Sequence, residues 1–144
     1  MPRPKSRATE PKAKAAVGVL VVSTRKPGKI LLVTSRRSKS WTLPKGHVDR
    51  ILGLAQSARR EAFEEAGVLG RMTTMPIGSY SHRKSSGGIF RVRVFKMHIR
   101  RELSRWPEKK ERQRRWASSR SVLKLVANPS LRRFIKIQLG VPRG

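Results

Sequence analysis

The sequence predicts a single α+β domain in which strands and helices pack as a sandwich. Its 144 residues suffice for one domain with a substantial hydrophobic core. Two apolar runs, "AVGVLVV" and "KILLV", are rich in the branched side chains that favour buried strands. A strongly helical segment follows them, and further helical segments close the chain. Strands and helices in this order indicate an α+β class rather than an all-helical or all-strand one.

The first half of the chain predicts a hairpin, a loop and a helix. Residues 16–24 and 29–36 are expected to form two strands, joined by the turn sequence "KPG". Residues 37–53 carry two glycines and a proline and are expected to form a loop. The segment "LAQSARREAFEEA" at 54–66 has strong helix formers throughout, and Gly67 is a favourable residue to end the helix.

The second half predicts a strand-rich stretch followed by helices. The segment "IFRVRVFKMHI" alternates apolar and basic residues over much of its length, which is typical of a half-buried strand. The expected elements are a strand around 71–80, a polar loop at 81–88, strands at 89–99 and 114–118, an exposed loop at 106–113, and helices at 119–127 and 130–139.

The charge of the chain indicates a strongly anionic partner. The sequence has 35 Lys and Arg against 8 Asp and Glu, a formal net charge of +27. Nucleic acid, polyphosphate or a heavily phosphorylated small molecule would each suit such a protein. Charge alone does not choose among them, and it leaves open that many of these side chains are ordinary solvated surface.

The termini and composition predict a cytoplasmic protein. Residues 1–15 are basic and proline-containing and are expected to be a disordered tail, with the domain spanning 16–140. The tail has no long apolar stretch typical of a secretion signal, and no apolar run approaches ~18 residues, so no membrane span is expected. The chain has no cysteine, which excludes disulfides and thiolate metal sites.

Three of the eight acids are concentrated in the predicted helix. Glu61, Glu64 and Glu65 stand at helical spacing, so they share one face. Neighbouring carboxylates repel one another, and a divalent cation would turn that repulsion into attraction, since Mg²⁺ prefers carboxylate oxygens. The alternative is a solvated helix face on which these glutamates pair with arginines.

Residues 46–68, "GHVDRILGLAQSARREAFEEAGV", resemble the Nudix box. That pattern is Gly, five residues, Glu, seven residues, then Arg-Glu-apolar-any-Glu-Glu-any-Gly-apolar. The matching positions are Gly46, Arg60, Glu61, Ala62, Glu64, Glu65, Gly67 and Val68. Leu52 stands where the box has its first Glu, and Asp49 is a candidate to replace it. The resemblance covers roughly 17–138 and is closest to the diphosphoinositol polyphosphate and diadenosine polyphosphate hydrolases.

The resemblance implies a fold, a reaction and a metal. The fold would be an α/β/α sandwich with a mixed sheet and a central loop-helix-loop motif. The reaction would be hydrolysis of a diphosphate bond with Mg²⁺ or Mn²⁺. By position, Glu61, Glu65 and the carbonyl of Lys45 look like metal ligands. Glu64 looks like the general base, with Glu61 as its rival, and Arg60 would orient a carboxylate of the cluster.

Basic residues outside the box are expected to bind substrate phosphates. Arg91 and Arg93 share one face of a predicted strand and would meet the substrate if that face lines the cleft. The full candidate set is Arg36, Arg37, Lys45, Arg83, Arg91, Arg93, Arg112 and Arg114. Trp41 and Trp116 are expected in the core or the cleft wall, and Trp41 is the better candidate of the two for stacking on a base.

Two classes of function therefore remain open. The first is an enzyme that hydrolyses a diphosphoinositol polyphosphate or a dinucleoside polyphosphate, with ADP-ribose, nucleoside diphosphate sugars and 5′-triphosphate RNA as other substrates. The second is a nucleic-acid-binding protein that keeps the same fold and uses its charge to grip the phosphate backbone.

Overall fold

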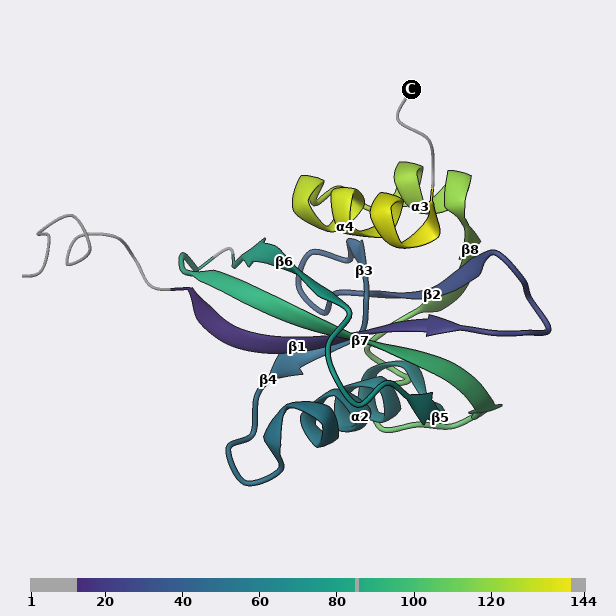
Figure 1. Ribbon diagram of the computed structural model, residues 1–144, viewed down its shortest axis with the longest axis horizontal. Coiled ribbons are helices and arrows are strands. Elements are labelled where there is room, and N and C mark those ends of the chain that lie inside the picture. Colours follow the sequence, from purple (N-terminus) through teal and green to yellow (C-terminus); the bar gives the residue numbers. More distant parts are fainter. Residues whose placement is uncertain (1–12, 85, 141–144) are drawn as a thin grey trace, which may run out of the picture.

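One mixed sheet lies between two layers of helices in the computed structural model, which describes residues 13–84 and 86–140 (Figure 1). In chain order the elements are β1 (Lys14–Val22), β2 (Lys29–Thr34), β3 (Trp41–Thr42), β4 (Lys45–His47), α2 (Gly53–Ala66), β5 (Val68–Met72), β6 (Gly78–Arg83), β7 (Ile89–Glu102), β8 (Arg114–Ser118), α3 (Ser119–Leu125) and α4 (Pro129–Leu139). No helix in this part of the chain is both long and apolar enough to cross a membrane.

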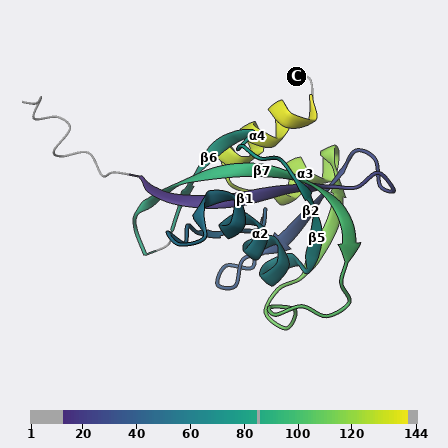
Figure 2. The ribbon, with the colours of Figure 1, turned by 60° about the horizontal axis from the view of Figure 1, so that its bottom comes forward.

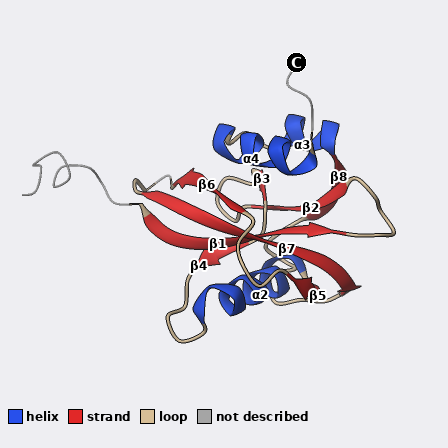
Figure 3. Cartoon of the chain, in the orientation of Figure 1, coloured by secondary structure: helices blue, strands red, loops and turns tan. Residues whose placement is uncertain are grey.

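The helices cover opposite faces of the sheet, so the predicted α/β/α sandwich is confirmed. Figure 3 shows α2 on one side and the pair α3 and α4 on the other. Ala58, Ala62 and Ala66 form a fully buried stripe on α2, and their small side chains let the helix pack closely on the sheet. The helices predicted on the two faces are confirmed as α2, α3 and α4. Gly67 ends α2 in the left-handed conformation.

The central pair of strands is parallel. β1 pairs with β7 along its whole length, from Lys14 opposite Phe90 to Val22 opposite His98. Val17 and Val19 pack toward α2, whereas Ala16 and Leu20 pack toward α3 and α4. Because β1 is buried on both faces, its sequence is a continuous apolar run rather than an alternating one.

Two predicted segments are wrong in detail. The expected loop at 37–53 contains the short strands β3 and β4, and β4 pairs with β1. The expected strand at 71–80 is two strands, β5 and β6, which pair with different parts of the long strand β7. Pro76 lies between β5 and β6 and has no N–H to continue a ladder, which explains the break.

The boundary between β6 and the following turn also differs from the prediction. Ser81, His82 and Arg83 were expected in a loop, but they complete β6. Their polarity reflects an edge strand, whose outer face is exposed. Near the N-terminus, β1 begins at Lys14, inside the segment expected as a tail, and residues 1–12 of that segment lie outside the described residues.

Candidate active site

A cleft of about 370 Å³ opens where α2, β4, β6 and the loop 103–113 come together. Four glutamates form one part of its lining, basic side chains another, and small or apolar residues the rest. The lining residues are Glu61, Glu64, Glu65 and Glu108; Arg36, Lys45, His47, Arg60, His82, Lys84 and Arg112; and Ala16, Gly46, Phe90 and Val92. Half of the eight acids in the sequence therefore face this one cleft.

The carboxylates of α2 are held in a poorly hydrated position. Glu61 and Glu65 are 9% and 5% exposed, and they lie one helical turn apart on the side of α2 that meets β4. Burial raises the pKa of Glu61 to about 7, and the nearby charge of Glu64 acts in the same direction. Burial also raises the pKa of Glu65, although the Arg112 guanidinium opposes the shift.

Gly46 leaves room for the carboxylate of Glu61. A Cβ atom at position 46 would lie 2.3 Å from the carboxyl carbon of Glu61. Next to it, the backbone N–H of Lys45 donates a hydrogen bond to Oε1 of Glu65 at 3.1 Å. The backbone of β4 therefore fixes where both carboxylates can lie, which explains why a glycine occupies this place.

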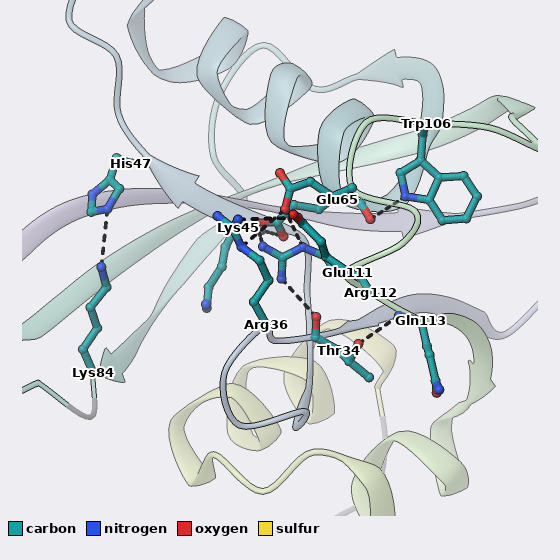
Figure 4. Close-up of polar contacts among 11 residues, drawn as sticks. Thr34, Arg36, Lys45, His47, Glu65, Lys84, Trp106, Glu111, Arg112 and Gln113 are labelled. Atoms are coloured by element: carbon teal, nitrogen blue, oxygen red, sulfur yellow. Dashed lines mark hydrogen bonds and ion pairs between the residues drawn. The ribbon is translucent and has the colours of Figure 1, made fainter.

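Arg112 is the internal counter-ion of the cleft. Its Nη2 lies 3.0 Å from Glu65, its Nε lies 2.8 Å from Glu108, and its Nη1 donates to the carbonyl of Thr34 at 3.0 Å. Figure 4 shows Arg112 between Glu65 and Thr34. With its side chain only 9% exposed, Arg112 is held in place and orients Glu65.

The loop 103–113 and Arg114, the first residue of β8, donate hydrogen bonds to the C-terminal end of α2. Helix ends leave carbonyl groups without partners inside the helix. Here the carbonyl of Glu64 accepts from the N–H of Glu108, that of Glu65 from the Trp106 indole N–H at 3.0 Å, and that of Ala66 from Arg114. The Trp106 ring also covers Gly67, where a Cβ would lie 2.7 Å from ring atoms. This loop thereby fixes the turn that carries the glutamates.

Replacing Trp106 with phenylalanine should lower the free energy of unfolding by about 1–3 kcal/mol, because the carbonyl of Glu65 loses its partly buried hydrogen-bond donor. Urea denaturation measures this effect. Trp116→Phe is the matched control, because the indole of Trp116 donates to the exposed Glu102. Equal losses in the two variants would contradict this role for Trp106.

The wall of the cleft formed by β4, β6 and β7 is cationic. Nζ of Lys84 lies 3.4 Å from Nε2 of His47 (Figure 4). The same Nζ lies 4.7 Å from the centre of the Phe90 ring. His82 lines the same wall. Burial, together with the charges of Lys45 and Lys84, lowers the pKa of His82 to about 4. The ring of His82 is therefore neutral near pH 7.

This lowered pKa predicts an acid-sensitive fold. The pKa of His82 is about 4 in the folded chain against an ordinary 6.5, so the unfolded chain binds the proton first as pH falls. Stability should therefore decline from about pH 6.5 to about pH 4 and be unaffected by this group above that window. Urea denaturation of His82→Gln should show a shallower decline than the wild type. An unchanged slope would mean that other groups cause the acid sensitivity.

The structure places only some of the predicted phosphate-binding residues in the cleft. Arg36, Lys45 and Arg112 line it. The predicted residues outside the lining are Arg37, Arg83, Arg91, Arg93 and Arg114. Because side chains alternate across a strand, the face of β7 that lines the cleft is that of Phe90 and Val92, opposite the one with Arg91 and Arg93.

The same alternation explains Arg83, whose neighbours His82 and Lys84 face the cleft instead. Arg114 contacts the end of α2 and lies 3.5 Å from Glu102. Trp41 is partly buried against the core and lines a second hollow beside Lys109. It therefore does not line the cleft that holds the glutamates of α2.

The residues before α2 also differ from expectation. Nη1 of Arg60 lies 3.3 Å from Asp49, so the carboxylate that it contacts is outside the α2 cluster. Asp49 accepts hydrogen bonds from the N–H groups of Ile51 and Leu52 and does not line the cleft. It therefore shapes the turn before α2 and does not replace the missing glutamate, a correction of the sequence-based hypothesis. Leu52 itself is 41% exposed.

Sequence reasoning missed Glu108 as a member of the cleft. It stands four residues before Arg112, and the two side chains form an ion pair. That spacing, together with the scarcity of acids in the chain, was the available signal. The residue types of the exposed loop gave no indication that it folds back onto α2.

The residues of the cleft suit a divalent cation. No ion pair reaches Glu61 or Glu64 within residues 13–84 and 86–140, so the buried carboxylate of Glu61 has no counter-ion. In the same ranges no three acidic or histidine side chains form a metal site by themselves. Mg²⁺ often takes only one or two carboxylates and completes its shell with water and substrate phosphate. Two glutamates beside the β4 backbone fit that pattern.

Comparison with known families decides the family of this fold and site. The family described as NUDIX domain matches residues 12–136. The chain belongs to the Nudix family. Of its relatives, Nudix hydrolase 12, mitochondrial, from Arabidopsis thaliana is 31% identical over 114 residues, which are 74% of this chain and 56% of that protein. The chain spans about half the length of the curated relatives it matches.

Solved Nudix structures share the fold. A NUDIX hydrolase from Nitrosomonas europaea superimposes with a TM-score of 0.73, at 18% identity and with 92% of each chain covered. A C. elegans Ap4A hydrolase in a binary complex superimposes with a TM-score of 0.63, at 22% identity, covering 87% of this chain and 98% of that one. These likenesses bear on the fold alone.

Proposed function

We propose that this Nudix protein hydrolyses a diphosphate bond in a highly anionic substrate, with Mg²⁺ or Mn²⁺ bound by Glu61, Glu65 and the carbonyl of Lys45. The observation that carries the proposal is the pairing of two walls in one cleft, where the glutamates of α2 face Lys45 of β4 and Lys84, which directly follows β6. A polyphosphate needs both: carboxylates to hold the cation and cationic groups to hold the remaining phosphate oxygens.

The side chains of the cleft have distinct roles in this reaction. The metal, when bound, neutralises phosphate oxygens and lowers the pKa of a coordinated water. Glu64 lines the cleft without an ion pair in the described part of the chain, so it is free to accept a proton from the attacking water. Arg112 holds Glu65 in orientation, and Lys84 holds a phosphate group on the opposite wall.

The lining favours a substrate with many phosphates over one recognised by its base. Phe90 is the one aromatic ring besides the two histidines in the cleft lining given by the described residues. Lys84 lies over that ring and His47 meets it edge-on, with ring centres 5.5 Å apart. No open platform for a base remains there. A diphosphoinositol polyphosphate is therefore the first choice, with a dinucleoside polyphosphate next.

The test is a substrate panel with Mg²⁺: diphosphoinositol pentakisphosphate, diadenosine tetraphosphate, ADP-ribose, a UDP-sugar and triphosphorylated RNA, with products resolved by chromatography. Metal-dependent cleavage that EDTA and Glu64→Gln abolish is the expected result, with the inositol compound cleaved fastest. If no compound is cleaved with either Mg²⁺ or Mn²⁺, the proposal fails, and the replacement of the first box glutamate by Leu52 becomes the first explanation to test.

A further inference from the structure

The arginines that face away from the cleft indicate a second anion-binding site. Arg91 and Arg93 lie on the outer face of β7, and Arg83 lies on the same face of β6, opposite Ile89. All three are exposed. In the pairing of these strands they stand at three successive levels, so they form a row; we call these three residues the arginine row.

The arginine row has a regular spacing. Residues two apart on a strand are about 6.6–6.8 Å apart along it. Arg93, Arg91 and then Arg83 therefore repeat at about that interval along the direction of β7. Ser79 and Ser81 stand opposite Arg93 and Arg91 on β6 and add hydroxyl groups to the same face. On the other side, Ala15 of β1 is opposite Arg91 and is too small to cover it.

No acid in the described part of the chain is left to neutralise the row. Four of the seven acids there line the cleft. Each of the other three has an arginine partner elsewhere: Asp49 with Arg60, Glu102 with Arg114, and Glu111 with Arg36. The ion pairs among the described residues include none with Arg83, Arg91 or Arg93. The row is thus a field of uncompensated positive charge.

We infer that the arginine row binds the backbone of single-stranded nucleic acid, independently of hydrolysis in the cleft. Guanidinium groups bind phosphate oxygens in a forked geometry, and serine hydroxyls are common phosphate contacts. Cationic side chains at three successive levels of an open sheet face suit an extended nucleic-acid strand, which presents one phosphate per nucleotide. The +27 charge of the whole chain would strengthen binding without adding sequence preference.

An anionic membrane is a less suitable partner for this face. Proteins that lie on membranes combine basic residues with apolar side chains that enter the lipid. The large exposed apolar residues of the described chain are Ile51, Leu52, Phe63, Leu69, Met75 and Ile137. None of them lies on β6 or on the part of β7 that carries the row.

The test measures binding of labelled single-stranded RNA and DNA by fluorescence anisotropy, in EDTA so that the cleft is inactive. The full chain should bind both, with an affinity that falls steeply as salt rises. The variant R83Q/R91Q/R93Q should bind about ten-fold more weakly or worse. Its slope of log affinity against log salt should be shallower by about 2, since each phosphate contact on a single strand contributes about 0.7.

The matched control is R120Q/K124Q/R133Q, which removes three exposed cations from α3 and α4 on the other face of the sheet. This control should keep the wild-type slope of log affinity against log salt. Equal losses in the two variants, or none in the first, would overturn the inference. So would binding to phosphatidylserine vesicles without binding to RNA or DNA. Hydrolysis by the first variant should be unchanged; loss of hydrolysis together with binding would place the row in the active site and overturn its independence.

Discussion

Glu64→Gln should lower kcat by about 10²–10⁴-fold with little change in KM, because the variant keeps the shape of the side chain and loses the proposed general base. Glu64 lines the cleft and has no ion pair in the described chain, so its replacement leaves no charged side chain without its ion-pair partner. Glu65→Gln should lower kcat by orders of magnitude as well, because the proposed metal ligand and the ion-pair partner of Arg112 are lost together. Steady-state kinetics on whichever panel substrate is cleaved gives both values.

The control for these variants is Glu102→Gln, which removes the same charge from the end of β7, outside the cleft. It should retain nearly full activity. Thermal unfolding should show that Glu64→Gln folds as the wild type does. If Glu64→Gln and Glu65→Gln both keep near wild-type turnover, the assignment of the active site is wrong, whatever the substrate.

Gly46→Ala should reduce kcat/KM by about 10²-fold while leaving the protein folded. The new methyl group would lie 2.3 Å from the carboxyl carbon of Glu61, so the carboxylate must move. The end of a glutamate side chain moves easily, and the cost in stability should therefore be small. A displacement of about 1 Å in a catalytic group is enough for a loss of this size.

A matched glycine separates this effect from backbone strain. Gly28 has a φ of 75°, and a Cβ there would meet nothing within 4 Å. Gly28→Ala should cost roughly 1 kcal/mol in unfolding free energy, from its left-handed backbone, and leave kcat/KM unchanged. A wild-type kcat/KM in Gly46→Ala would show that catalysis does not need the position of Glu61 that β4 sets.

Much of this protein could be predicted from its sequence because the signals were local. The helix 53–66 was predicted to within one residue, since helix formers and a terminal glycine are properties of the segment itself. The strands of the hairpin were evident from their apolar runs. The spacing of Glu61, Glu64 and Glu65 with Gly46 indicated the family, and the structure brings these residues to one cleft.

The wrong placement of Arg91 and Arg93 has a physical origin. The sequence pattern of a strand does not show which of its two faces the fold covers. Arg91 and Arg93 were correctly predicted to share a face, but alternation says nothing about which face meets the cleft. That choice depends on the packing of β7 between β1 and β6, which turns Phe90 and Val92 toward the cleft and the arginines outward. Similarly, Asp49 looked available for a metal, yet its carboxylate is used by the turn before α2.

By itself, the sequence determined the fold class, the position of α2 and the set of glutamates on it, because these follow from local propensity and fixed spacing. Only the tertiary structure decided which charges oppose them. The loop 103–113 brings Glu108 and Arg112 to Glu65 across more than forty residues of chain. His82 at the end of β6 and Lys84 just after it line the cleft, while Arg83 between them does not. These contacts depend on burial and strand pairing between distant segments, which no local pattern encodes.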